Sequence, residues 1–285
     1  MKLYARDLVL DLSRSHVMGI LNITPDSFFD GGKYNRHTQA LNHVQEMIHS
    51  GATIIDVGGE SSRPYAKAVS LEQELERVIP IIESIVTRFN VWVSVNTSQP
   101  KIMQEAACAG VHMINDIRSL QIPGALSMAA TLDLPICLTH MQGEPNNMQD
   151  LPYYQDVLCD VKTFFVQRIA YCKSYGIKKS QLLLDPGFGF GKNLSHNYQL
   201  LAYLADLHYF RLPLLVGLSR KRMIGQLLNL KASQCLLGSL SCAVIAAIQG
   251  AHILRVHDVR ETVEALRIVA EVKSARECRE HHEHV

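Results

Sequence analysis

The chain has 285 residues, of which 47% are hydrophobic and 19% charged, and 28 Lys and Arg residues against 27 Asp and Glu residues leave a net charge of +1. This composition can bury a large core, which excludes wholesale disorder, and the near-neutral charge argues against a dedicated nucleic-acid-binding surface. A small local anion site remains compatible with it. The seven cysteines form no C-x-x-C pair and most have apolar neighbours, which is typical of reduced core thiols and predicts a cytoplasmic protein.

One stretch, residues 232–254, has the length of a membrane span and contains no Lys, Arg, Asp or Glu. Several polar residues interrupt it, however, and Gly250 divides it. We interpret it as a buried helix that ends at the glycine, followed by a buried strand. Because Lys2 and Arg6 also interrupt any apolar run at the N-terminus, the sequence predicts neither a signal peptide nor a membrane partner.

Short apolar runs alternate with helical patterns along the whole chain. The runs cover residues 17–21, 53–57, 91–95, 112–114, 135–138, 181–184, 214–217 and 253–256. The helical patterns cover residues 37–49, 71–89, 99–109, 123–132, 154–175, 197–207, 221–228, 234–249 and 259–276. Most runs are apolar at successive positions rather than at alternate ones, which indicates strands buried on both faces of a parallel sheet.

Eight strand–helix units in one series predict an α/β protein with a single TIM (β/α)8 barrel domain over residues 1–285. The competing fold is an open doubly wound sheet, but no glycine-rich dinucleotide turn follows the first strand. We expect residues 277–285 to form a disordered tail. The tail sequence His281-His282-Glu283-His284 has metal-ligand chemistry, but its place beyond the last helix favours a solvated chain end.

Polar residues follow every apolar run, at the end of the barrel where active sites of this fold lie. They are Asn22, residues 58–63, Asn96, Asn115 with Asp116, Thr139 with His140, Asp185, residues 219–222, and Arg255 with His257. Any one of them could be an ordinary turn residue, but eight together indicate one polar rim. Short Asn and Asp side chains suit a flat polar heterocycle, with Asp185 accepting two N–H bonds from its edge.

Three consecutive cations, Arg220, Lys221 and Arg222, lie at the expected start of a helix. Cations oppose the helix dipole there, whereas a bound anion would use both the dipole and the free N–H groups. Arg255 and His257 arrive from the eighth strand, and Arg63 comes from a glycine-flanked loop. We infer an anionic, polyphosphorylated substrate; the alternative is a solvated run of charge.

Residues 185–192 contain three glycines and end in Lys192, but the spacing is not that of a phosphate-binding P-loop. The glycines more readily let the backbone approach a ligand, with Phe188 or Phe190 stacking on it. Residues 22–36 and 58–69 are expected to form a pair of mobile lids.

Two long motifs carry a family resemblance. Residues 18–32 read MGILNITPDSFFDGG and residues 51–64 read GATIIDVGGESSRP, and the shorter motifs NDIR, LDPGFGFGK, GLSRK and RVH follow in order. Over residues 2–270 the chain resembles the dihydropteroate synthase family. The resemblance implies a transferase of folate biosynthesis that is a homodimeric TIM barrel, uses Mg2+ and is inhibited by sulfonamides. It implies that 4-aminobenzoate is joined to 6-hydroxymethyl-7,8-dihydropterin diphosphate, with diphosphate leaving first.

The resemblance also implies a role for each matching residue. The pterin would contact Asn96, Asn115, Asp185 and Lys221, and the diphosphate would contact Asn22, Ser62, Arg63, Arg255 and His257. Asn22 would also hold Mg2+. The 4-aminobenzoate pocket would be shaped by Phe28, Pro64, Phe190, Ser219 and Arg222. Catalysis would depend most on Lys221, Arg255, His257, Arg63 and Asp185.

The chain departs from the family pattern at several positions. Asn96 stands where the family has Asp, which removes a negative charge facing a cationic intermediate, so Asn96→Asp is expected to raise turnover. Thr139 replaces a Met, Ser62 a Thr, and the bulky Phe29 and Tyr65 replace small residues in the expected lids. These departures leave a catalytically impaired pterin-binding relative as one alternative. A pterin-dependent methyltransferase is another, although it has no need for the set of anion-binding residues.

Overall fold

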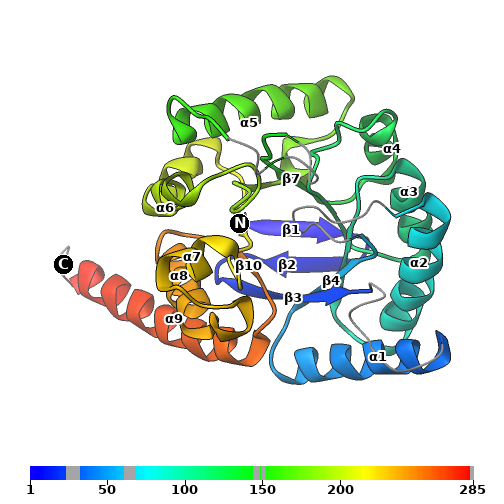
Figure 1. The fold of residues 1–285 in the computed structure, drawn as a ribbon, viewed down its shortest axis with the longest axis horizontal. Coiled ribbons are helices and arrows are strands. Elements are labelled where there is room, and N and C mark those ends of the chain that lie inside the picture. Colours follow the sequence, from blue (N-terminus) through cyan, green and yellow to red (C-terminus); the bar gives the residue numbers. More distant parts are fainter. Residues whose placement is uncertain (24–32, 61–68, 144–147, 149–151, 283–285) are drawn as a thin grey trace.

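A ring of parallel strands surrounded by helices forms the body of the molecule (Figure 1). The computed structural model describes residues 1–23, 33–60, 69–143, 148 and 152–282, and of residues 33–36 and 277–282 it describes the backbone alone. The strands of the ring are β3 (His16–Asn22), β4 (Ile54–Gly58), β5 (Trp92–Asn96), β6 (Met113–Asp116), β7 (Ile136–Thr139), β8 (Leu182–Asp185), β9 (Leu215–Val216) and β10 (Ile253–Val256). Each strand overlaps one of the apolar runs of the sequence.

The sheet closes on itself. Its strand order is β8-β7-β6-β5-β4-β3-β10-β9, and each neighbouring pair is parallel. A parallel bridge between Leu184 and Leu214, with the Leu184 N–H 2.9 Å from the Pro213 oxygen, joins the two ends. This closure confirms the predicted TIM barrel and excludes the open doubly wound sheet.

Helices cover the outside of the ring. They are α1 (Lys33–His49), α2 (Leu71–Arg88), α3 (Pro100–Ala109), α4 (Ala125–Leu132), α5 (Val157–Ser174), α6 (Leu194–Ala202), α7 (Arg222–Leu228), α8 (Leu236–Ile248) and α9 (Val259–His282). Short 3-10 helices, η2 (Lys179–Gln181), η3 (Leu204–Phe210) and η4 (Ala232–Gln234), lie between them. Ser70 caps α2 as expected, since its side chain accepts the Gln73 N–H.

Several helix boundaries differ from the sequence-based expectation. Helix α1 begins at Lys33 instead of residue 37, and α5 begins at Val157 instead of residue 154. The helix expected over 197–207 is divided into α6 and η3, and α6 begins at Leu194 because the Asn193 side chain caps it through the His196 N–H. The last helix, expected to end near residue 276, continues to His282.

The apolar stretch over 232–254 is divided as predicted. It supplies α8 and β10, which are separated by Gly250 with a φ of 92°. Among the described residues, no helix is long and apolar enough to cross a membrane.

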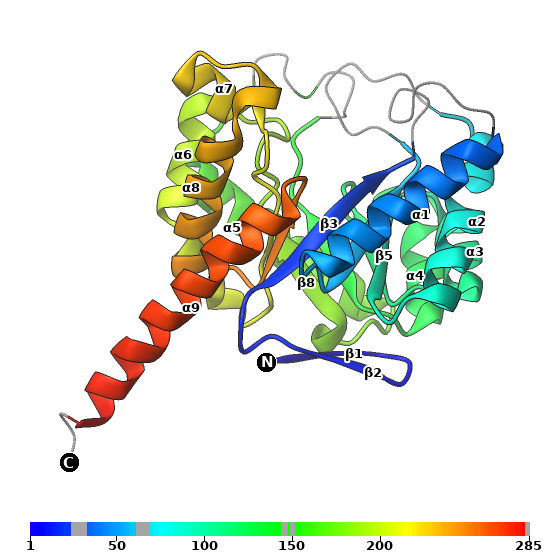
Figure 2. The same ribbon diagram turned by 90° about the horizontal axis from the view of Figure 1, so that it is seen from below.

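An N-terminal hairpin was not predicted from the sequence. It consists of β1 (Lys2–Ala5) paired antiparallel with β2 (Leu8–Asp11), and Leu3, Ala5 and Leu10 join the main core. In Figure 2 the hairpin lies at one end of the barrel, opposite the end toward which β3 points. It therefore covers the amino ends of the strands and leaves a site to the carboxyl ends.

Candidate active site

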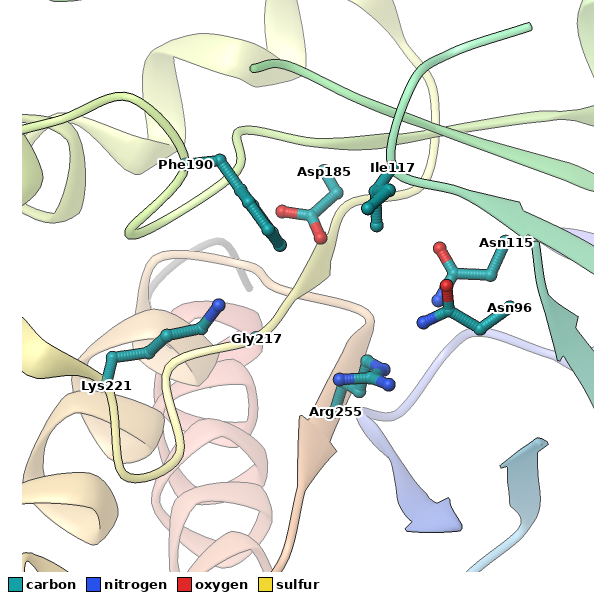
Figure 3. Close-up of a pocket in the computed structure, with 8 residues that line it drawn as sticks. All are labelled: Asn96, Asn115, Ile117, Asp185, Phe190, Gly217, Lys221 and Arg255. Carbon is teal, nitrogen blue, oxygen red and sulfur yellow. The ribbon is translucent and has the colours of Figure 1, made fainter. Parts of the chain in front are cut away.

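A pocket lies at the carboxyl ends of the barrel strands (Figure 3). Four of its residues end strands or lie within them: Asn96 on β5, Asn115 on β6, Asp185 on β8 and Arg255 on β10. The rest of the lining comes from the loops that follow the strands, namely Ile117, Phe190, Gly217 and Lys221. The structure thus brings together the four residues assigned to the pterin. Ile117 is a lining residue that the sequence did not single out.

Asp185 and Lys221 bring opposite charges to the lining of the pocket. Asp185 is 6% exposed and its Oδ1 accepts the Gly187 N–H at 2.8 Å. Burial raises the pKa of Asp185, while that N–H and the nearby Lys221 oppose the rise. Burial likewise lowers the pKa of Lys221 to about 8, against the attraction of Asp185. Each group therefore stabilises the other's charge in a poorly hydrated site.

Phe190 provides an aromatic face beside this pair. It is 7% exposed, and the Lys221 Nζ lies 4.3 Å from the centroid of its ring. A cation over an aromatic ring is attracted to the ring's electron-rich face. Together with the Asn and Asp side chains, the ring provides what a planar heterocycle needs: a flat surface and in-plane hydrogen-bonding groups.

Lys192 holds the glycine-rich loop, residues 187–191, through hydrogen bonds to its backbone. Its Nζ lies 3.0 Å from the carbonyl oxygens of Gly187 and Phe190 and 2.8 Å from His140 Nδ1. Burial lowers the pKa of Lys192 to about 7, whereas its carbonyl acceptors favour the charged form. Lys192 is 2% exposed and binds the loop, not the pocket, in agreement with the prediction that this is not a P-loop.

Asp56 is a central residue of the site that the sequence analysis missed. It is fully buried in the middle of β4, and its Oδ2 accepts from Asn96 Nδ2 at 3.2 Å, Asn115 Nδ2 at 3.2 Å and Arg255 Nε at 2.6 Å. Its position inside the apolar run of β4 was a usable signal, because a charge in a buried strand is almost always paired.

Arg255, His257 and Ser219 lie together at the rim, where strands β9 and β10 end. The Ser219 Oγ lies 3.1 Å from His257 Nδ1 and 3.2 Å from the His257 backbone nitrogen. Burial, assisted by Arg255, lowers the pKa of His257 to about 4, so the imidazole is neutral at neutral pH. If the serine hydroxyl donates to Nδ1, the proton of the neutral ring is on Nε2, available as a donor. Ser219, expected in the aminobenzoate pocket, thus contacts His257, which was expected to bind the diphosphate.

The expected cluster of three consecutive cations is divided by the fold. Arg220 is paired with Asp258 through Nε–Oδ2 at 3.1 Å and Nη2–Oδ1 at 2.5 Å. Arg222 is exposed at the start of α7 and does not line the pocket formed by the described residues. Only Lys221 of the three lines it, because successive residues at a helix start point in different directions.

Several expected site residues lie outside the described residues: Phe28, Ser62, Arg63 and Pro64, together with the substituted Phe29 and Tyr65. Asn22 is described as the last residue of β3, half-buried and in register with Gly58. Thr139 is buried beside Asp185 in the sheet register, and its Oγ1 has no hydrogen-bond partner among the described residues.

A magnesium ion would find few protein ligands in the part of the chain described. No group of three His, Cys, Asp or Glu side chains could hold a metal there. Mg2+ usually keeps several waters and binds through substrate phosphates with one or two protein oxygens. The Asn22 amide oxygen at the end of β3 fits that pattern, in which a diphosphate supplies most of the ligands.

Comparison with known proteins identifies the family to which the chain belongs. Residues 18–257 match the family model of pterin binding enzymes. The chain is 62% identical over 277 residues to the dihydropteroate synthase of Escherichia coli, covering 97% of this chain and 98% of the relative. It is 51% identical over 268 residues to that of Haemophilus influenzae, covering 94% of this chain and 98% of the relative.

A crystal structure of Yersinia pestis dihydropteroate synthase with a sulfonamide drug complex is 61% identical, with a TM-score of 0.92, and the match covers 96% of this chain and 100% of that one. The motifs at the rim, the closed barrel and these near-full-length matches agree. The chain belongs to the dihydropteroate synthase family of pterin-binding enzymes.

Proposed function

We propose that this chain is a dihydropteroate synthase that joins 4-aminobenzoate to 6-hydroxymethyl-7,8-dihydropterin diphosphate, forming 7,8-dihydropteroate and diphosphate. The observation that carries the proposal is the pocket at the carboxyl end of the barrel. There the buried Asp185 faces the cations Lys221 and Arg255, beside the Phe190 ring. This combination supplies hydrogen-bond acceptors for a pterin edge, a stacking face, and positive charge for a phosphate.

Pterin binding would use the in-plane groups of the pocket. The Asp185 carboxylate accepts N–H bonds from the pterin edge, and the amide groups of Asn96 and Asn115 contact the ring from the neighbouring strands. Charged hydrogen bonds of this kind are about twice as strong as neutral ones. Phe190 and Lys221 lie where they would cover the ring face.

The reaction would begin with loss of the diphosphate. The bond between the pterin methylene carbon and the diphosphate oxygen breaks, and the electron pair leaves with the oxygen. Arg255 and His257, with Arg63, stabilise the charge that develops on the leaving group. Mg2+, held in part by Asn22, supplies further neutralisation of the diphosphate when bound. The aminobenzoate nitrogen then bonds to the methylene carbon and loses a proton.

The aminobenzoate would bind beside the pterin, at the mouth of the pocket. Phe28, Pro64 and Phe190 would provide apolar contacts, and Ser219 a polar one. Arg222 is exposed at the start of α7, from where its long side chain would pair with the carboxylate at the mouth of the pocket. Sulfonamides are expected to compete for this place, as analogues of aminobenzoate.

The two alternative functions have less support. The relatives matched at high identity are named dihydropteroate synthases, which does not favour an impaired pterin-binding relative. The cation Arg255 and the neutral donor His257 at the rim also have no evident role in a methyltransferase reaction without a diphosphate.

A homodimer is proposed from an exposed apolar face. On α8, Leu237 is 76% exposed and Ile248 is 60% exposed, and on the adjacent α9, Ile268 is 68% exposed. Large apolar side chains exposed on two neighbouring helices are typical of a protein interface. The six described cysteines are free, which supports a reducing, cytoplasmic location.

The test of the function is a diphosphate-release assay on the purified chain, with each component omitted in turn. We expect release only when the pterin diphosphate, 4-aminobenzoate and Mg2+ are all present. No release with the complete mixture would refute the proposed activity.

A further inference from the structure

One buried carboxylate connects three of the residues that line the pocket. Asp56 is on β4, and its Oδ2 accepts from Asn96 on β5, Asn115 on β6 and Arg255 on β10. These partners are 40, 59 and 199 residues away in the chain. Asp56 itself does not line the pocket and is 0% exposed. It therefore acts on a ligand only through the groups that it holds.

The contacts with Asp56 fix which way the two amides face. An ionised carboxylate only accepts hydrogen bonds, so each amide must turn its NH2 group toward Asp56. In Figure 3 the amide nitrogens of Asn96 and Asn115 lie on the side nearer Arg255, and the oxygens point away from it. The Asn115 Oδ1 is buried and has no hydrogen-bond partner among the described residues. Both amides thus present an acceptor oxygen to the pocket.

The same carboxylate also sets the position of the Arg255 guanidinium. The Arg255 Nε lies 2.6 Å from Asp56 Oδ2, and the Arg255 side chain is only 16% exposed. Binding through Nε leaves the two terminal NH2 groups of the fork for other acceptors. Arg255 is therefore held by its inner edge, and none of the described residues is hydrogen-bonded to its outer donors, which can meet an anion.

We propose that Asp56 is a positioning residue of the pterin site: it orients Asn96 and Asn115 as acceptors and holds Arg255 toward the leaving group. The inference rests on the proposed function, since the pterin diphosphate is the ligand positioned. It also explains how the chain accommodates Asn96. Asn96 donates a hydrogen bond to Asp56. The negative charge at this place is therefore carried by Asp56 on β4, and Asn96 on β5 is its neutral partner.

The test compares Asp56→Asn with the exchange variant Asp56→Asn/Asn96→Asp. Asn at position 56 loses the charge and can turn its own NH2 toward the amides. Losing one or two well-directed hydrogen bonds should raise KM for the pterin diphosphate by roughly 10–100-fold. KM for 4-aminobenzoate should stay within about twofold, because that substrate does not contact the three held groups. The exchange variant moves the carboxylate to the partner strand and should recover most of the loss.

Asp116→Asn is the matched control. Asp116 is also 0% exposed and ends the neighbouring strand β6, but it accepts from the Ser98 hydroxyl and from the Arg118 and Leu120 N–H groups, none of which lines the pocket. The Asp116→Asn variant should have a lower melting temperature, but it should not raise KM for the pterin diphosphate relative to KM for 4-aminobenzoate. Calorimetric binding of the pterin diphosphate to each protein gives a second readout that does not require turnover.

The outcomes separate the two proposals. Wild-type turnover tests the proposed function, and the differences between variants test Asp56. A folded Asp56→Asn protein with an unchanged affinity for the pterin diphosphate would overturn the assignment. So would a loss that the exchange variant does not recover, including failure of both proteins to fold, because Asp56 would then be a residue of the core alone. Recovery of binding by the exchange variant supports the assignment even if the single variant does not fold.

Discussion

At the scale of single residues, the pocket depends on buried groups that keep their charges because they face one another. Asp185 has a pKa raised by burial, and Lys221 has a pKa lowered by burial to about 8. Either group alone would tend to lose its charge in such a site. Both line the same pocket, and the charge of each opposes the effect of burial on the pKa of the other.

Asn96→Asp tests the electrostatics of the same pocket. A carboxylate at 96 would lie near Asp56 Oδ2, which is 3.2 Å from Asn96 Nδ2. Two neighbouring carboxylates repel each other, so the pair would retain one proton at the lower pH values, while the positive charge of Arg255 favours full ionisation. The negative form should stabilise the pterin cation. We therefore expect the ratio of variant to wild-type kcat to rise between pH 6 and pH 8.5 and to exceed one at the upper end.

The measurement is kcat for both proteins across that pH range, with saturating substrates. A ratio that stays below one, or that does not change with pH, would show that position 96 does not act through its charge. Asn42→Asp serves as a control, because Asn42 is exposed on α1 and does not line the pocket.

At the scale of elements, the glycine-rich loop after β8 is the part of the site with the least freedom. Gly187 has a φ of 70°, and a Cβ there would lie 1.8 Å from the His140 oxygen. Its N–H is also the one that binds Asp185. The loop must therefore stay where it is to hold both Asp185 and Phe190.

Gly187→Ala should move this loop and lower kcat/KM by about 100-fold, since a displacement of about 1 Å is enough for a loss of that size. Gly176→Ala is the control, because Gly176 also has a positive φ of 88° but nothing lies within 4 Å of its Cβ position. It should cost about 1 kcal/mol in stability from backbone strain and leave kcat/KM unchanged. Equal activities of the two variants would contradict this view of the loop.

Helix α2 packs against Gly59, just after β4, and contains a buried acid. Glu74 is 3% exposed, and burial raises its pKa to about 7, with Glu60 adding to the rise and Thr97 opposing it. Because the folded value lies above the ordinary value of 4.5, the folded state holds this proton more tightly. The resulting stability is fully present below pH 4.5 and is lost as the pH rises through 7.

Glu74→Gln removes this dependence. We expect its free energy of unfolding, relative to the wild type, to increase by about 1–3 kcal/mol from pH 5 to pH 8. Denaturant titrations at the two pH values measure it. The exposed Glu83 on the same helix gives the control Glu83→Gln. The prediction fails if the two variants show the same pH dependence.

The elements also show what the sequence could predict. Buried parallel strands are continuous apolar runs, so all eight barrel strands were identified. The β1–β2 hairpin was missed because its strands are not continuous buried runs: buried and exposed residues alternate over only four positions in each, which is too short a pattern to identify. Asp56 was missed because its role depends on hydrogen bonds with residues up to 199 positions away in the chain. Likewise, no pattern distinguishes Arg220, which pairs with Asp258, from Lys221, which lines the pocket.

At the scale of the whole molecule, the barrel has a covered end and an open end. The hairpin covers the amino ends of the strands, and the pocket lies at the carboxyl ends (Figure 2). The exposed apolar residues of α8 and α9 lie on the outer wall. A dimer formed there would leave the mouth of each pocket open to substrate.

Leu237→Glu/Ile268→Glu places two charges in this outer face and should convert a dimer into a monomer in sedimentation velocity experiments, since buried unpaired charges are strongly unfavourable. Val166→Glu on α5, where Val166 is 54% exposed, is the control and should remain dimeric. A wild-type chain that is monomeric at every concentration would contradict the proposed dimer, as would an unaffected double variant.

The most direct test of the central claim is to measure both products together, 7,8-dihydropteroate by mass spectrometry and diphosphate by a coupled assay, in one reaction of the wild-type chain. A dihydropteroate synthase forms them in a ratio of one to one, and we predict that ratio throughout the time course. Diphosphate released without dihydropteroate would show that water, not 4-aminobenzoate, attacks the methylene carbon of the pterin. Absence of both products would show that the site binds without catalysing the reaction.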